Sequence, residues 1–265
     1  MNRQSRKLNL FCSKFSLARP METRRVRRWL KTTLVVLLML VAAGAASLAY
    51  KRQFVVSRAM APGLQTGDVV AVSRLSYGLS RHSFSAFSRY FSARLWPAAP
   101  QRGDVAVVKL PRDGQTDFVL RVIGLPGERV QLRAGRVYIN DVEAAREIAP
   151  PVRLAGADGQ PYDQPVTIET LPGGARYAIM QTQGDQGRLA TTPVFEVPAD
   201  SYFLLADNRD NAVDSRLPEA YGLGFVPFEN FVGRADIVLY SLEADLAGPA
   251  VASHIRWDRI LQRVR

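Results

Sequence analysis

The sequence is poor in residues that form disulfides or bind metals. It has one cysteine, Cys12, and two histidines, His82 and His254, among 265 residues. Because Cys12 lies near the N-terminus, the rest of the chain can form no disulfide and offers no thiolate nucleophile. The histidines are far apart in sequence, and no Cys/His cluster has metal-ligand spacing. We therefore expect no metal centre and no cofactor.

Acidic residues are nearly absent from residues 1–31, which contain ten lysines and arginines and one glutamate. This stretch carries +9 of the net charge of +11, so the other 234 residues carry only +2. Residues 32–50 have no charge over 19 positions, close to the roughly 20 that a membrane-crossing helix needs. Because lysine and arginine accumulate on the cytoplasmic side, we expect a cytoplasmic tail, a transmembrane helix in contact with lipid, and a periplasmic domain.

Two other interpretations of the N-terminal region remain open. A cleaved signal peptide also begins with basic residues and ends with small ones, as at residues 42–47, but its apolar core usually spans about 7 to 15 residues. A nucleic-acid-binding tail would also be basic, but orientation and lipid contact account for charge beside a membrane span. We expect no nucleic-acid partner. Met21 is an alternative start, and the oligomeric state is not indicated.

Past residue 50 the pattern favours β-strands. Runs rich in valine and isoleucine alternate with glycine and proline at residues 68–75, 103–110, 117–125 and 232–242. Such runs favour antiparallel sheets in sandwich or barrel layers. We expect a mainly β domain over residues 51–242, with surface insertions at about 76–100 and 144–164. Residues 243–265 form a basic amphipathic segment that either rests on lipid or packs on the domain.

Several sequence blocks, taken in order, resemble bacterial type I signal peptidase from about Arg52 to Tyr240. They are SRAMAPGLQTGDVVAVSRLSYG (57–78), RGDVAVVKLP (102–111), DFVLRVIGLPGERV (117–130), ETLPGG (169–174), ADNRDNAVDSR (206–216) and GFVPFENFVGRA (224–235). The resemblance implies an antiparallel, barrel-like β protease fold after one transmembrane helix. It also implies action on signal peptides of exported proteins, with a serine nucleophile and a lysine base.

The positions that this resemblance makes catalytic carry apolar residues in this chain. The attacking serine of the first block corresponds to Ala59, and the lysine base ahead of Arg121 corresponds to Leu120. A serine that orients the lysine corresponds to Ala212. With none of the three intact, we expect a pseudoenzyme.

Other parts of the family site are retained. The resemblance assigns the Ser57 hydroxyl and the Ala59 backbone N–H to an oxyanion hole. The remaining matches are expected to form the cleft and to hold its loops by ion pairs rather than to move protons. They are Met60, Pro62, Arg121, Asp207, Asn208, Arg209, Asp210, Asp214, Ser215 and Arg216.

Three functions follow from these observations. We expect a protein that binds or assists exported, signal-peptide-bearing clients without cutting them. One alternative is an active signal peptidase with unrecognised residues, although Ser57 lies two residues, roughly 6.5 Å, from the nucleophile position. Lys51 and Lys109, the only lysines past residue 50, belong to other blocks. The other alternative is a structural partner of a membrane complex.

Overall fold

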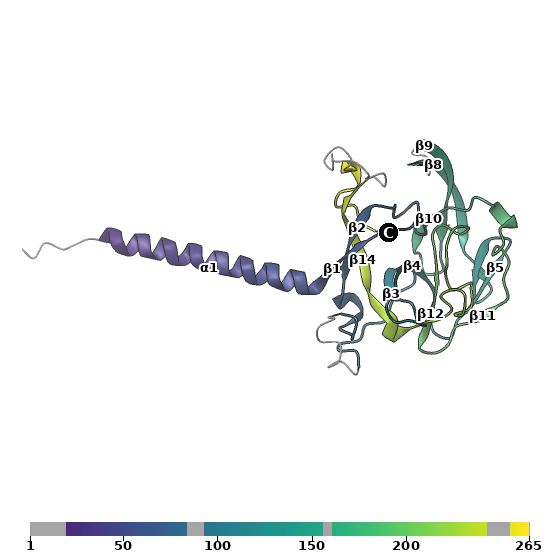
Figure 1. Cartoon of the computed structure of the whole chain (residues 1–265), viewed down its shortest axis with the longest axis horizontal. Coiled ribbons are helices and arrows are strands. Elements are labelled where there is room, and N and C mark those ends of the chain that lie inside the picture. Colours follow the sequence, from purple (N-terminus) through teal and green to yellow (C-terminus); the bar gives the residue numbers. More distant parts are fainter. Residues whose placement is uncertain (1–19, 84–92, 156–160, 243–254, 265) are drawn as a thin grey trace, which may run out of the picture. The chain divides into compact units, whose positions relative to one another are not determined.

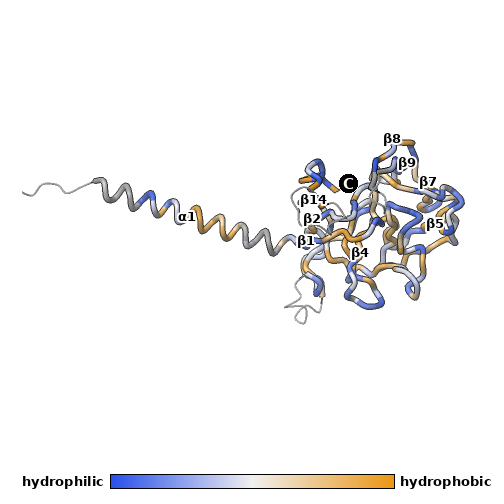
Figure 2. The backbone as a smooth tube through the Cα atoms, turned by 45° about the horizontal axis from the view of Figure 1, so that its top comes forward, coloured by the Kyte–Doolittle hydropathy of each residue, from blue (hydrophilic) through white to orange (hydrophobic). Residues whose placement is uncertain are grey.

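The computed structural model describes residues 20–83, 93–155, 161–242 and 255–264, and it divides into two compact units, Met1–Leu48 and Ala49–Arg265. The helix α1 (Pro20–Ala49) contains most of the predicted span, and apolar residues occupy its middle (Figures 1 and 2). Its many alanines and leucines favour a helix. Among the described residues, no helix has both the length and the apolar character needed to cross a membrane. Residues 1–19 of the predicted tail lie outside the described residues.

The second unit consists of three sheets, in which every pairing between named strands is antiparallel. The prediction of a mainly β antiparallel domain is thus confirmed. The seven-stranded sheet has the order β1 (Tyr50–Phe54), β2 (Asp68–Ser73), β14 (Phe231–Ser241), β3 (Val105–Lys109), β4 (Asp117–Gly124), β12 (Ser201–Leu205) and β13 (Val226–Pro227).

The two smaller sheets adjoin this one in the second unit (Figure 1). One has the order β11 (Phe195–Glu196), β5 (Arg129–Arg133), β6 (Arg136–Ile139) and β7 (Val142–Glu143). The other has the order β10 (Arg176–Ile179), β9 (Pro161–Thr170) and β8 (Ala145–Ala155). Short 3-10 helices occur at η1 (Leu75–Tyr77), η3 (Gly184–Gln186), η4 (Phe228–Asn230) and η6 (Trp257–Arg259).

The seven-stranded sheet is curled, and its strands β2 and β12 are buried on both faces. Lys51 on β1 bonds to Asp117 on β4 although three strands lie between them in the sheet order. Every residue of β2 and of β12 is buried, which explains their continuous apolar runs. The strand β4 contributes to two apolar clusters, Leu120 to the first and Ile123 to the second. It is therefore fixed from both sides.

The second predicted insertion is a β-hairpin made of β8 and β9, which the sequence did not indicate as strands. Its ladder runs from Ala145 opposite Thr170 to Ala155 opposite Pro161, with an irregularity between Ala149 and Val152. Pro150 and Pro151 lie at that irregularity, where a missing backbone N–H is tolerated. Proline, which favoured a loop in the sequence, therefore marks a bulge. Part of the first insertion, residues 84–92, lies outside the described residues.

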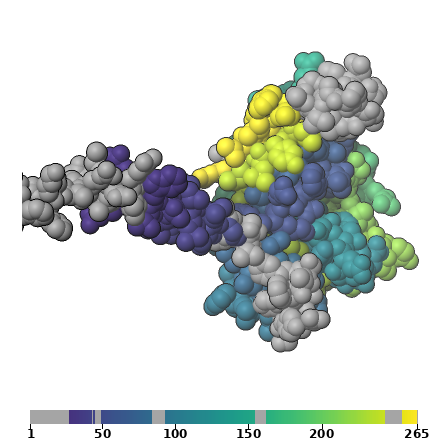
Figure 3. Space-filling model, turned by 60° about the vertical axis from the view of Figure 1, so that its left-hand side comes forward, coloured from purple at the N-terminus to yellow at the C-terminus, as the bar shows by residue number. Residues whose placement is uncertain are grey.

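The C-terminal segment packs on the β domain over residues 255–264, which is one of the two predicted possibilities. Leu261 and Val238 of β14 are joined by a 2.8 Å backbone hydrogen bond, in which the Leu261 N–H donates. Arg259 is buried and forms an ion pair with Asp68 at the start of β2. In the space-filling view the segment, in yellow, lies against β14, in yellow-green (Figure 3). Residues 243–254 lie outside the described residues.

Candidate functional site

The residues that matched the nucleophile block lie in one loop, Val55–Gly67, between β1 and β2, which we call the site loop. It folds into turns because the Ala61 N–H donates to the Arg58 carbonyl at 3.1 Å and the Leu64 N–H donates to the Met60 carbonyl at 2.8 Å. Met60 is buried in the first apolar cluster, and the Ala61–Pro62 peptide is cis. Anchored by Met60, the loop leaves Ser57 exposed and Ala59 half-buried.

A second loop, residues 206–216, holds the site loop from one side. The backbone N–H of Asn208 donates to the Ala59 carbonyl at 2.9 Å, and its side-chain amide donates to the Arg58 carbonyl at 3.1 Å. Asn208 is buried, and its Oδ1 accepts no hydrogen bond from the described residues. Two blocks that are 150 residues apart in sequence thus meet at Ala59.

The structure brings Ala59, Leu120 and Ala212 into one apolar environment. Leu120 is fully buried in the first apolar cluster, and the half-buried Ala59 and Ala212 pack against the same cluster. Ala106 is the cross-strand neighbour of Leu120. A methyl or isobutyl group can neither attack a carbonyl nor accept a proton. The side chains at these three positions therefore supply apolar contact and neither a nucleophile nor a base.

The two predicted oxyanion-hole groups are close together. The Ala59 N–H points to the Ser57 Oγ at 3.4 Å, a long hydrogen bond in which the hydroxyl is the acceptor. The Ser57 hydroxyl keeps its own proton for a second partner. A peptide carbonyl placed here would find the Ser57 O–H as a donor, and it would take the Ala59 N–H only in place of the Ser57 Oγ.

Beneath the site loop lies a buried ion pair between Arg121 of β4 and Asp207. The guanidinium donates twice to the carboxylate, through Nε at 2.7 Å and Nη2 at 2.6 Å, and its Nη1 donates to the Gly103 carbonyl at 2.8 Å. The guanidinium carbon of Arg121 lies 4.0 Å from the ring centre of Tyr177. Burial raises the pKa of Asp207, although the Arg121 charge acts in the opposite direction.

Glu169 at the end of β9 is a second buried centre, which the sequence did not single out. Its carboxylate binds Arg209, Arg146 and the Tyr177 hydroxyl, the last at 2.7 Å. Burial is the largest influence and acts to raise the pKa of Glu169, but the charges of Arg209 and Arg146 together leave that pKa lowered. The only sequence signal was its place at the head of the ETLPGG block.

The rest of the second loop is tied down by its own acidic and basic residues. Asp214 pairs with Arg216 and accepts the Ala206 N–H at 3.2 Å. Arg216 also donates to the Arg209 carbonyl at 2.6 Å, and Ser215 Oγ accepts the Leu204 N–H at 3.0 Å. Asp210 points elsewhere and accepts from Thr182 and Gln183. These are the contacts that a scaffold makes, and that role stays a prediction.

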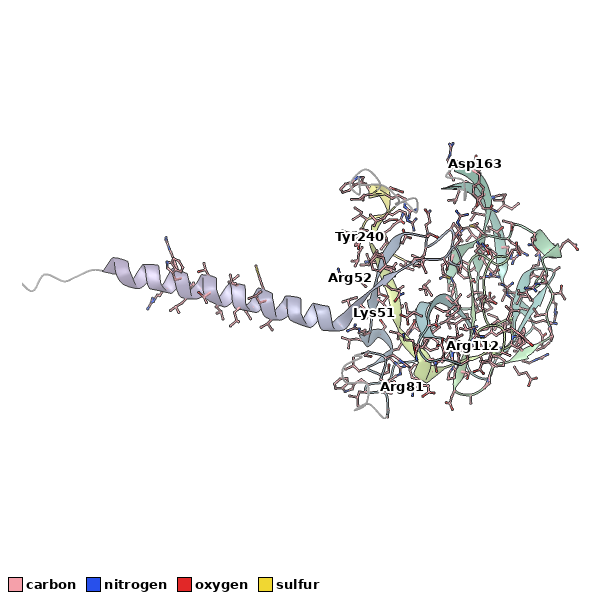
Figure 4. The ribbon with its side chains drawn as sticks, viewed as in Figure 1. Lys51, Arg52, Arg81, Arg112, Asp163 and Tyr240 are labelled. Atoms are coloured by element: carbon pink, nitrogen blue, oxygen red, sulfur yellow. The ribbon has the colours of Figure 1, made fainter. Side chains whose placement is uncertain are left out.

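Both lysines past residue 50 bind the same carboxylate. Lys51 and Lys109 lie 2.6 Å and 2.9 Å from Asp117, which is the cross-strand partner of Lys109. Leu120 follows Asp117 by three residues, so it points to the opposite face of β4. Lys51 and Arg52 lie side by side on β1 at the edge of the sheet (Figure 4). Neither lysine is therefore placed to replace a base at Leu120.

The described part of the chain contains no group of three His, Cys, Asp or Glu residues placed to hold a metal ion.

Comparison with known proteins places these features in one family. The family model described as signal peptidase, peptidase S26, matches residues 26–240. This chain belongs to the S26 signal peptidase family. The match includes the site loop, β4 and the second loop, which carry Ala59, Leu120 and Ala212.

Individual relatives carry the name signal peptidase I. Those of Rickettsia typhi and Rickettsia prowazekii are each 38% identical over 182 residues, which is 66% of this chain and 66% of each relative. That of Rickettsia canadensis is 37% identical over 182 residues, 66% of this chain and 65% of the relative. The matched stretch thus spans about two thirds of each relative's length.

A solved signal peptidase I from Enterococcus faecalis V583 matches 52% of this chain and 97% of its own, with 28% identity and a TM-score of 0.30. That score is too low to support an argument about the fold.

Proposed function

We propose that this protein engages exported proteins that carry signal peptides and does not cleave them. The observation that carries this proposal is the common apolar environment of Ala59, Leu120 and Ala212. In the family resemblance, these positions hold the nucleophile, the base and the residue that orients the base. The chain keeps the family scaffold around them.

The loss of chemistry at these positions is large. In serine proteases, removing the nucleophile or the base costs on the order of a million-fold in turnover, or roughly 8 kcal/mol, and removing both costs little more. An oxyanion hole alone supplies about a thousand-fold over water. Processing of exported proteins needs far more than this residual rate.

Binding, in contrast, requires only the parts that remain. The Ser57 hydroxyl can donate to a carbonyl, the Ala59 N–H beside it donates to Ser57 Oγ through a long hydrogen bond that a ligand can displace, and Asn208 fixes the backbone that presents both. The half-buried methyl of Ala59 and the apolar cluster beneath it favour small apolar side chains over charged ones. A segment of the Ala-x-Ala type, with small residues near the family's cleavage site, fits these requirements.

A restoration series tests this function. The triple variant Ala59→Ser, Leu120→Lys, Ala212→Ser is expected to cleave an Ala-x-Ala-containing peptide, measured by mass spectrometry of the products. The single variants and the unchanged chain are expected to bind the peptide and leave it intact. A matched control replaces Leu120→Lys by Leu120→Met, which keeps the new hydroxyls but supplies no amine.

Two outcomes would contradict the proposal. Cleavage by the unchanged chain, abolished by Ser57→Ala or Lys109→Met, would assign an active peptidase with other residues. Failure of the unchanged chain to bind any such peptide, together with capture of a membrane protein partner, would favour a structural role.

We also infer that residues 32–50 anchor the chain in the bacterial inner membrane, with residues 1–31 in the cytoplasm and the β domain in the periplasm. The charge asymmetry of the sequence supports this orientation. A fusion of alkaline phosphatase, which is active only outside the cytoplasm, to the C-terminus is expected to be active in the membrane fraction. Activity in a soluble periplasmic fraction would instead indicate a cleaved segment.

A further inference from the structure

The charges around the site loop affect whether the loop can bind an uncut chain or a cut signal peptide. An uncut chain presents a neutral carbonyl at the cleavage position. A cut signal peptide presents a carboxylate there, which is costly to bury unless a cation or several donors accompany it. The two forms are otherwise identical up to that residue.

The described residues place no uncommitted buried cation beside Ala59. Lysine is replaced at Leu120, and Lys51 and Lys109 bind Asp117 on the other face of β4. We call the buried ions Arg121, Asp207, Glu169 and Arg209 the floor. The three donor nitrogens of Arg121 already bond Asp207 and Gly103.

Oxygen acceptors adjoin the loop instead. Asp207 Oδ2 lies 3.4 Å from where a side chain on Gly63 would begin, so this carboxylate borders the site loop. Asn208 Oδ1 is a buried acceptor that no donor in the described residues satisfies. Burial already raises the pKa of Asp207 despite its Arg121 partner, which indicates that this neighbourhood disfavours a negative charge. A second carboxylate would meet both the apolar cluster and these oxygens.

We propose that the site selects chains that are still uncut: it accepts the neutral carbonyl of an intact peptide bond and rejects the carboxylate that cleavage leaves. This selection rests on the proposed function. It implies release of the signal peptide once a separate peptidase has hydrolysed the bond. In a sequence of reactions, this protein therefore acts before that hydrolysis.

Three labelled peptides with the same Ala-x-Ala sequence test the selection by fluorescence anisotropy with the full chain in detergent. One continues for several residues past the last alanine, one ends there as a carboxamide, and one ends there as a free carboxylate. We expect equal affinity for the first two and about tenfold or more weaker binding of the third, since only the third brings an uncompensated charge.

Two variants test whether the lack of a cation at the site causes the weaker binding of the carboxylate peptide. Leu120→Lys is expected to recover binding of the carboxylate peptide at least in part, because the bound carboxylate favours protonation of the otherwise neutral buried amine, whereas the neutral Leu120→Met is not. Arg58→Gln removes the only charged side chain in residues 55–67. It is expected to leave the ranking of the three peptides unchanged, because Arg58 is exposed and salt screens charges at exposed positions.

Other results overturn the selection. Equal or tighter binding of the carboxylate peptide would do so, and loss of that binding in Arg58→Gln would identify Arg58 as the cation responsible. If none of the three peptides binds, the proposed function itself is contradicted and the selection with it. Binding of all three without discrimination refutes only the selection.

Discussion

The three apolar positions and the buried ions of the floor are expected to respond differently to substitution. The side chains of Ala59, Leu120 and Ala212 pack against one apolar cluster. Each can therefore change to another apolar side chain without leaving a charge unpaired. In the floor, Arg121 and Glu169 are buried ions whose partners are all inside the protein. We therefore expect an apolar substitution at one of the three positions to destabilise the fold less than the loss of one ion from the floor.

The largest loss of stability is expected when an ion pair of the floor is broken. Arg121→Met leaves Asp207 buried without its cation, which is expected to lower the free energy of unfolding by about 3–5 kcal/mol. Urea denaturation followed by tryptophan fluorescence measures this loss. Arg176→Met is the matched control, since it breaks a pair with Glu147 in which both side chains are more than half exposed, 57% and 63%. Equal losses of unfolding free energy in Arg121→Met and Arg176→Met would contradict the difference expected between buried and exposed ion pairs.

The second prediction places a charge at one of the apolar positions, Leu120. Leu120→Lys puts an amine where the native side chain is fully buried, so the folded state favours the neutral amine. We expect a loss of about 2–4 kcal/mol at pH 7 that shrinks toward pH 10, as the unfolded chain also loses the proton. Leu120→Met should lose less than about 1.5 kcal/mol at both pH values.

The next effect concerns the C-terminal segment. Arg259 pairs with the buried Asp68 and donates to the Gly63 carbonyl at 3.0 Å, so it holds the far end of the site loop. Arg259→Met is expected to cost about 2–3 kcal/mol, since other groups still bond Asp68. Amide hydrogen exchange in the loop should accelerate more than in β12. Arg263→Met, at an exposed position, should change neither quantity.

Sequence patterns predicted the β class of the domain because alternation and valine-rich runs report burial directly. They did not predict the β8–β9 hairpin, since Pro150 and Pro151 indicate a loop unless a bulge accommodates them. At the site, the match of blocks indicated Asp207 and Arg209 but not Glu169, whose role depends on partners 40 and 23 residues away. The sharing of Asp117 by two lysines requires the curl of the sheet, which no local pattern encodes.

The smallest effect is expected at His82, which is outside both regions. Burial, followed by the charges of Arg81, Lys109 and Arg94, lowers the pKa of His82 from 6.5 to about 4. The unfolded chain therefore binds the proton more tightly, so the contribution to stability is complete above pH 6.5 and is lost as the pH falls toward 4.

His82→Gln tests this pH dependence because it removes the proton-binding group. The difference in urea midpoint between the unchanged chain and the variant is expected to decrease steadily from pH 7 to pH 4.5. A difference that does not vary with pH would show that His82 titrates alike in the folded and unfolded states. Since the imidazole is only half-buried, water reduces the effect, which should stay below that of breaking any pair in the floor.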